Sequence, residues 1–293
     1  MSSAFAELAE LEYRLGDWPA AHASALESLR ASRRAGLDQE AMASLVRLAC
    51  IEAGLGRSRD CRRHAARARK LGRARGIAAI EVQAGEAVGF LELGFDRIDS
   101  AIETLEGVAE LAAEHPDMCT TATWTTDLAE AYLRRGDRQA AERTMARLTE
   151  GSGFVREPAL ERTAAMLSDS STYERFFRRA LAWSEGAQQP FELARTQLCF
   201  GERLHREGRL QEACERVRTA LASFEALGAR PWARRAQRLI AAWGRPARQS
   251  SLGARHLHGR AVRADLRPRP AELGCVEAEG DHRIGTLSLG LFH

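Results

Sequence analysis

Glycine recurs along this chain in one local context, between two stretches that carry apolar residues at helical spacing. The recurrent glycines are Gly16, Gly56, Gly94, Gly136 and Gly208. Their spacings are 40, 38, 42 and 72 residues, and the last is two periods of 36. A glycine can adopt the left-handed conformation that ends a helix and lets the chain reverse. The pattern therefore predicts a repeat protein whose unit is a helical hairpin.

Alignment of the repeats on these glycines gives three columns of common chemical character. Seven positions before the glycine every residue is small: Ala9, Ala49, Ala87, Ala129 and Gly201. Eight positions before it, four residues of five are apolar: Leu8, Leu48, Glu86, Leu128 and Phe200. Five positions after it stand Ala21, Cys61, Asp99, Ala141 and Ala213. Small residues on facing sides let two helices approach closely, and these offsets resemble those of the tetratricopeptide repeat.

The apolar period predicts six helix pairs and a closing helix. The expected helices span 4–15, 19–35, 38–54, 58–75, 78–93, 96–114, 117–135, 138–149, 159–168, 172–185, 191–207, 210–227 and 231–243. Prolines at 116, 158, 190 and 231 fall at predicted helix starts, where a missing amide hydrogen costs little. The fifth pair has no turn glycine, and side-chain oxygens of its segment 168–171 are expected to cap the next helix. The predicted fold is all-α, a tetratricopeptide-like α-solenoid of about six hairpins plus a closing helix.

Two regions are predicted, a helical repeat domain over 1–243 and an irregular or disordered tail over 244–293. The tail lacks a sustained apolar period, and it holds four of the eight histidines and seven of the 24 glycines. We therefore do not expect it to belong to the repeat fold.

Charge is balanced over the repeat region, with 35 basic and 35 acidic side chains, while the tail holds eight arginines and five acids. Nonspecific binding to nucleic acid requires clustered basic groups, so direct DNA binding is not expected. No stretch approaches the ~18 uncharged apolar residues that span a bilayer, so we expect no membrane partner and a cytoplasmic location.

The segment from Pro190 to Ile240 resembles the last repeat of the helical arm in LuxR-type transcriptional regulators of the large ATP-binding class. The resemblance rests on PFELAR at 190–195, GERL at 201–204, GR at 208–209, FEALGA at 224–229 and PWA at 231–233. Residues 1–189 fit the same arm more loosely, through repeat spacing and composition. The resemblance implies a signal-receiving arm that stands between a P-loop ATPase module and a DNA-reading helix-turn-helix.

Those two flanking modules are not recognisable in this chain. No Gly-x-x-x-x-Gly-Lys-Ser/Thr motif occurs, and the only lysine, Lys70, lies in a predicted helix, so no nucleotide or other cofactor is predicted. The residues from 246 onward lack the helix-turn-helix pattern of the family. The resemblance therefore implies a truncated or frameshifted regulator, or a piece of a longer one.

Groove residues are the candidates for contact with a partner, because first helices line the concave side of tetratricopeptide-like arrays. The uncharged, threonine-rich run 118–126 lies on such a helix. The predicted contacts are Thr123, Thr126, Glu130, Arg195, Glu202 and His205. A protein or peptide partner is expected, and self-association or a small-molecule effector is compatible with the same surface. The alternative is a solvated or buried threonine face. A carboxylate clamp of the chaperone-binding type is excluded, because the chain has no asparagine and one lysine.

The remaining histidines and cysteines indicate neither a metal site nor catalysis. Metal-ligand types occur in the tail at irregular spacing: His256, His258, Cys275, Asp281 and His282. Two cysteine pairs lie on the helices of single hairpins, 50 with 61 and 199 with 214, and packing is a simpler role for them than disulfide formation. Histidines at 22, 64, 115 and 205 lie on different repeats without a nucleophile or paired carboxylates, so no catalytic residue is predicted.

Two functions fit these observations, and neither requires a cofactor, a metal or an enzyme activity. The first is the signal-receiving, protein-interacting arm of a LuxR-type transcriptional regulator that lacks its own helix-turn-helix. The alternative is a free-standing tetratricopeptide-like scaffold that binds another protein.

Overall fold

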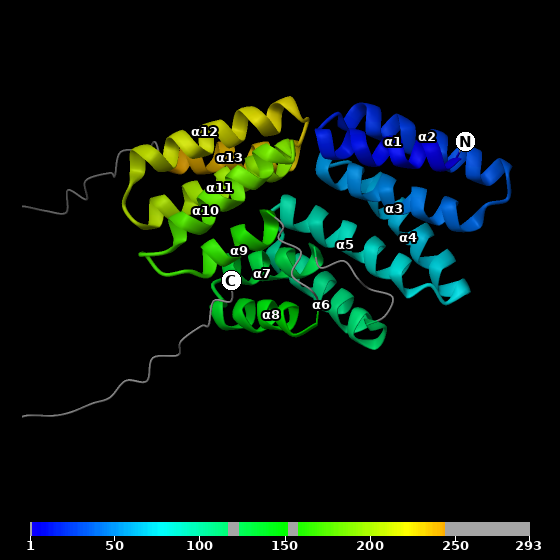
Figure 1. Ribbon diagram of the computed structural model, residues 1–293, viewed down its shortest axis with the longest axis horizontal. Coiled ribbons are helices and arrows are strands. Elements are labelled where there is room, and N and C mark those ends of the chain that lie inside the picture. Colours follow the sequence, from blue (N-terminus) through cyan, green and yellow to red (C-terminus); the bar gives the residue numbers. More distant parts are fainter. Residues whose placement is uncertain (1, 117–122, 152–157, 244–293) are drawn as a thin grey trace, which may run out of the picture. The chain divides into compact units, whose positions relative to one another are not determined.

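The computed structural model describes residues 2–116, 123–151 and 158–243, and these form thirteen α-helices with no strand among them (Figure 1). The helices are α1 (Ser2–Leu15), α2 (Trp18–Arg34), α3 (Asp38–Leu55), α4 (Ser58–Arg75), α5 (Ala78–Gly94), α6 (Ile98–Glu114), α7 (Thr123–Arg135), α8 (Arg138–Gly151), α9 (Pro158–Leu167), α10 (Tyr173–Gly186), α11 (Pro190–Arg206), α12 (Leu210–Ala226) and α13 (Arg230–Trp243). Twelve of them match the predicted bounds within two residues. Residues 117–122, with which the expected seventh helix begins, and the whole tail lie outside the described residues.

The chain is an all-α, tetratricopeptide-like solenoid of six hairpins with α13 as the closing helix. Residues in the left-handed conformation mark its turns, at Gly16, Gly36, Gly56, Gly76 and Asp96, so each turn comes 20 residues after the last. The same spacing separates Gln188, Gly208 and Gly228. One hairpin therefore occupies 40 residues over most of the array.

The prediction for Gly94 was wrong, because this glycine is the last residue of α5 and the left-handed position is taken by Asp96 at φ 66°. A Cβ atom at Gly94 would lie 3.0 Å from Nε1 of Trp232. The glycine is thus needed for close approach of α13 and not for the turn. Aspartate is among the few residues with a side chain that tolerate a left-handed turn position.

The aligned small columns lie where the two helices of each hairpin meet. The alanines before the turn are at most 1% exposed: Ala9, Ala49, Ala87 and Ala129. The residues after the turn are fully buried at Ala21, Cys61, Ala141 and Ala213. At Gly201 a Cβ atom would lie 2.5 Å from Cγ2 of Val217 on the facing helix. The columns therefore form the hairpin interfaces, as predicted.

Three of the four prolines predicted to start helices do so, and the start predicted at Pro116 involves residues outside those described. Pro158 and Pro190 are the first residues of α9 and α11, and Pro231 is the second residue of α13. The predicted side-chain cap of the fifth hairpin was wrong, because the N-cap residue of α10, Thr172, makes no side-chain cap hydrogen bond. Asp169 Oδ1 instead accepts hydrogen bonds from the backbone amides of Ser171 at 2.9 Å and Thr172 at 3.0 Å, in the turn before the helix. Hydrogen bonds from the hydroxyl and amide groups of these two residues lower the pKa of Asp169 to about 2.

The last hairpin and α13 pack against the first three hairpins. The rings of Trp18 on α2 and Phe191 on α11 lie 5.2 Å apart between centroids. Phe90 on α5 is 5.5 Å from both Phe191 and Trp232. A Cβ atom at Gly16 would lie 2.7 Å from Cγ of Pro190. These contacts join residues more than 100 positions apart, so the array closes on itself (Figure 1).

None of the helices in the described ranges is long and apolar enough to cross a membrane.

Candidate functional site

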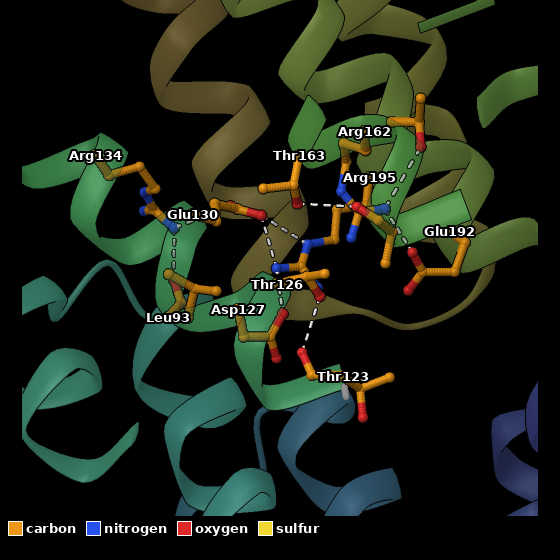
Figure 2. Close-up of polar contacts among 12 residues, drawn as sticks. Leu93, Thr123, Thr126, Asp127, Glu130, Arg134, Arg162, Thr163, Glu192 and Arg195 are labelled. Atoms are coloured by element: carbon orange, nitrogen blue, oxygen red, sulfur yellow. Dashed lines mark hydrogen bonds and ion pairs between the residues drawn. The ribbon is translucent and has the colours of Figure 1, made fainter. Parts of the chain in front are cut away.

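A buried arginine lies at the centre of the closed array. Arg195 on α11 donates from Nη2 to Asp127 Oδ1 at 2.6 Å and to Glu130 Oε2 at 2.7 Å, and from Nε to the same Glu130 oxygen at 3.0 Å. All three residues are at most 5% exposed. Asp127 and Glu130 are three residues apart on α7, so both carboxylates reach one side of that helix (Figure 2).

A second arginine connects this cluster to α13. Arg235 donates from Nη1 to Glu130 Oε1 at 3.0 Å and from Nη2 to both carboxylate oxygens of Glu202 at 2.8 Å. The guanidinium groups of Arg195 and Arg235 also lie 4.8 Å and 5.8 Å from the centre of the Trp232 ring. Glu130 is therefore shared by two arginines, which fixes α7, α11 and α13 relative to one another.

A third arginine enters from α9. Arg162 is 1% exposed, and its Nη1 donates to Glu192 Oε2 at 2.5 Å and lies 3.5 Å from Thr196 Oγ1 (Figure 2). Its Nε atom finds no hydrogen-bond partner among the residues that the structure describes. Four helices, α7, α9, α11 and α13, thus contribute charged side chains to one buried network.

The two carboxylates of α7 differ in their affinity for a proton. Burial opposes the ionisation of both. For Asp127 burial outweighs the attraction of Arg195 and raises the pKa. For Glu130 the guanidinium groups of Arg195, Arg235 and Arg134 outweigh burial and hold the pKa well below its ordinary value. Glu130 is therefore the fixed negative charge around which the network is organised.

An open hollow of about 240 Å³ adjoins the network. It is lined by Asp96, Ile98, Arg134, Glu202, Arg235, Arg238 and Leu239. Arg134 donates to the Leu93 carbonyl oxygen at 3.0 Å and pairs with Asp96, and Arg238 Nη2 lies 2.9 Å from Asp96 Oδ2. Three guanidinium groups, two carboxylates and two aliphatic side chains thus line one small concave surface.

The guanidinium groups of this hollow are not equally accessible. The Arg134 side chain is 9% exposed, and burial together with the nearby charge of Arg235 lowers its pKa. The Arg238 side chain is 55% exposed. Burial opposes the ionisation of Asp96, but the arginines around it lower its pKa. The hollow therefore presents two kinds of guanidinium group, the buried one of Arg134 and the solvent-exposed one of Arg238.

Three of the six predicted groove residues come together here. Glu130 and Arg195 are in direct contact, and Arg235 joins them to Glu202. A fourth predicted residue, Thr126, lies one turn before Glu130 on α7. It is 3% exposed and donates to the Thr123 carbonyl oxygen at 2.8 Å.

The other two predicted residues lie outside this cluster. Thr123 is exposed and its hydroxyl donates to Glu86. His205 stacks on Trp243 with ring centroids 4.3 Å apart. A role for the six residues in partner contact stays a prediction.

Several residues of the network were not among the sequence candidates. They are Asp96, Asp127, Arg134, Arg162, Arg235 and Arg238. Asp127 had a signal, because it stands three residues before Glu130 directly after an uncharged run. The arginines had none, because arginine is frequent throughout this chain.

The four cysteines in the described residues are free thiols, at 50, 61, 199 and 214. Burial raises the pKa of Cys50 and of Cys199 to about 12, and it raises that of Cys61 further. Thiols with such pKa values carry little thiolate at neutral pH and are poor nucleophiles. The tail residues with metal-ligand side chains, including Cys275, lie outside the described residues.

A buried carboxylate joins two histidines in the first two hairpins. Glu52 on α3 is 1% exposed, and its two carboxylate oxygens lie 3.1 Å from His22 Nε2 and 2.8 Å from His64 Nδ1. Burial opposes the ionisation of Glu52, but the two hydrogen bonds outweigh it and lower the pKa. The sequence placed these histidines on separate repeats and gave no sign that they share one partner.

Replacement of Glu52 by glutamine is expected to lower the free energy of unfolding by about 2 kcal/mol at neutral pH, because the buried charge that both histidines contact is lost. A lowered pKa in the folded state stabilises the protein above the ordinary value of 4.5 and ceases to do so as pH falls through the folded value. The difference from wild type should therefore shrink on acidification. Urea denaturation over a pH series measures it.

Glu27→Gln, on the exposed side of α2, serves as the control and should change stability by less than about 0.5 kcal/mol at every pH. A Glu52→Gln effect that stays constant down to the acid limit would contradict the assigned role of the charge.

No protein-family model and no curated protein sequence matches the chain. Solved structures do match it, and three of these are Rap proteins. The apo form of RapI matches with a TM-score of 0.57 and 11% identity over 81% of this chain and 84% of that one. A Rap protein complexed with Competence and Sporulation Factor matches with a TM-score of 0.53 and 11% identity over 82% and 74%.

The third is the Rap conjugation gene regulator of the plasmid pLS20 in complex with the Phr* peptide, with a TM-score of 0.54 and 10% identity over 85% of this chain and 75% of that one. At such low identity the likeness is one of fold and does not transfer individual residues. The chain therefore shares the all-helical repeat fold of the Rap proteins.

Proposed function

We propose that this chain is the signal-receiving arm of a LuxR-type transcriptional regulator, and that a peptide binds the hollow lined by Arg134, Glu202 and Arg238. The carrying observation is that hollow, which opens at the junction of α7, α11 and α13. A ligand there would touch the helices that close the array. A ligand that binds the closed array more tightly than an open one would shift the equilibrium toward the closed form. Such a shift is how a receiver arm passes on a signal.

The lining of the hollow defines the chemistry of the ligand. A carboxylate fits the guanidinium groups of Arg134 and Arg238, because an added negative charge offsets the cost of holding Arg134 buried. An ammonium group fits Glu202, and an aliphatic side chain fits Ile98 and Leu239. Together these features favour a short peptide with a free carboxyl end.

The Rap structures support a peptide as the ligand class, since one of them holds the Phr* peptide. The LuxR affiliation is supported by the ordered sequence pattern between residues 190 and 240, which includes Phe191 and Trp232. The flanking DNA tests this affiliation. We expect it to encode a P-loop upstream, or a helix-turn-helix in another frame downstream. Unrelated neighbouring sequence would contradict it.

A free-standing interaction scaffold is the alternative function. It is favoured by the RapI comparison, in which 84% of that chain matches this fold, so most of a whole protein can consist of such repeats. The peptide proposal holds in either setting, because it depends on the hollow alone.

Binding of pentapeptides is expected to depend on Arg238. A synthetic pool with free carboxyl ends is screened with the labelled full chain, and hits are measured by titration calorimetry. Arg238→Gln should weaken binding about tenfold, because a hydrogen bond to a charged group contributes about 1.5–3 kcal/mol. Peptides with amidated carboxyl ends should bind the wild-type chain about as weakly as the free-carboxyl peptides bind Arg238→Gln.

Arg234→Gln is the matched control, since Arg234 is an exposed arginine of α13 that does not line the hollow. It should leave binding unchanged. Equal loss in both arginine variants would point to general charge attraction, and a pool without any binder would exclude the peptide proposal.

A further inference from the structure

Helix α1 carries an apolar stripe that is left exposed by the other twelve helices of the described ranges. Its residues Ala4, Leu8, Leu11 and Leu15 follow the alternating spacing of four and three residues that places side chains along one side of a helix. The three leucines are 43%, 54% and 48% exposed. They make up half of the six exposed large hydrophobic residues in the described part of the chain.

The equivalent positions in the next repeat are packing positions. Forty residues after Leu8 and Leu11 stand Leu48 and Ile51 on α3, and both are 0% exposed. The first hairpin packs on α3 through α2 and α1. Equivalent positions are thus buried where another helical hairpin adjoins them. The stripe on α1 is a packing surface of the same kind that no described residue covers.

Two charges beside the stripe define the neighbour. Glu7 and Arg14 are exposed, seven residues apart, and lie along the same edge of the stripe. Ser3 Oγ donates to Glu7 Oε1 at 3.3 Å, and among the described residues Arg14 has no ion-pair partner. A negative and a positive group one heptad apart are self-complementary across a two-fold axis.

We propose that α1 pairs antiparallel with α1 of a second copy of this chain. In the register that overlaps the whole stripe, Leu8 packs against Leu11 of the other copy, and Leu15 against Ala4. The same register places Glu7 opposite Arg14, twice by symmetry. A parallel pair would place Glu7 opposite Glu12 of the other copy, so Glu7 would lose the pairing with Arg14. Charge therefore selects the antiparallel arrangement.

The resulting dimer is expected to be weak. Fourteen residues of helix span about 21 Å, so the contact is smaller than a standard protein interface. It uses no residue of the hollow, so it holds whether or not the hollow binds a peptide. We therefore expect a dissociation constant in the micromolar range.

Sedimentation velocity of the full chain from about 1 to about 100 μM tests this surface. A concentration-dependent shift from monomer to dimer is expected. Leu11→Glu should abolish the shift, because it buries a charge in the seam. Leu210→Glu is the matched control, since Leu210 is equally exposed at 54% but lies on α12, and it should leave the dimer intact. Circular dichroism confirms that both variants fold.

Charge exchange tests the register. Glu7→Arg and Arg14→Glu should each weaken self-association about tenfold or more, since each creates two like-charge contacts. An equimolar mixture of the two variants should form a heterodimer, and the double variant should recover wild-type association. A chain that stays monomeric at every concentration would overturn the proposal. So would a dimer that survives Leu11→Glu, or one that the double charge exchange fails to restore.

Discussion

Replacement of Arg195 by methionine is expected to lower the free energy of unfolding by about 3–5 kcal/mol, because it removes one member of a buried ion network. Asp127 and Glu130 accept three hydrogen bonds from this side chain and are at most 5% exposed. Without Arg195, Asp127 loses its only ion-pair partner in the described residues and must stay buried. Urea denaturation followed by circular dichroism measures the change.

Arg206→Met on the exposed end of the same helix is the control, and it should shift stability by less than about 0.5 kcal/mol. Arg195→Met combined with Asp127→Leu should be more stable than Arg195→Met alone, because the uncompensated carboxylate is then gone. A cost below about 1 kcal/mol for Arg195→Met, or full additivity in the double variant, would contradict a coupled buried network.

Replacement of Trp232 by alanine is expected to cost about 3–5 kcal/mol, the range for a large aromatic side chain lost from a packed core. Trp232 is 0% exposed, and its ring lies 5.5 Å from Phe90, 5.5 Å from Phe191 and 6.0 Å from Phe224 between centroids. The cavity would open where α13 meets α5, α11 and α12. Loss of the helical circular dichroism signal in urea reports the change without relying on tryptophan fluorescence.

Within the described part of the chain, the indole Nε1 atom of Trp232 has no hydrogen-bond partner. Trp232→Phe keeps an aromatic ring and removes this unpaired donor, so it should cost less than about 1.5 kcal/mol. Trp183→Ala, at a tryptophan that is 43% exposed, should have a small effect. Similar costs for Trp232→Ala and Trp183→Ala would contradict a closing role for α13.

The hairpins could be predicted from the sequence because their determinants are local and repeated. Small residues such as Ala49 and Cys61 recur at fixed offsets from each turn, and each pair reports a contact within one hairpin. Gly94 shows where this reasoning stops. Its offset was that of a turn residue, but its role is set by Trp232, which comes 138 positions later.

The buried network could not be derived in the same way. Periodicity placed Glu130, Arg195 and Glu202 on first helices, which ordinarily line an open groove. Whether the first helices of distant hairpins face solvent or one another depends on small rotations between successive hairpins. No residue pattern within one repeat encodes the sum of those rotations. Arg235 was missed for this reason.

The contact between the two ends of the array changes how such a chain should unfold. In a linear array each repeat depends only on its neighbours, and end repeats can fray while the middle remains folded. Here Trp18 of the first hairpin touches Phe191 of the last, so neither end can separate without breaking contacts in both. We therefore expect the closed array to unfold as one cooperative unit, because damage to α13 reaches Trp18 of α2 through Phe191 without passing through the hairpins between them.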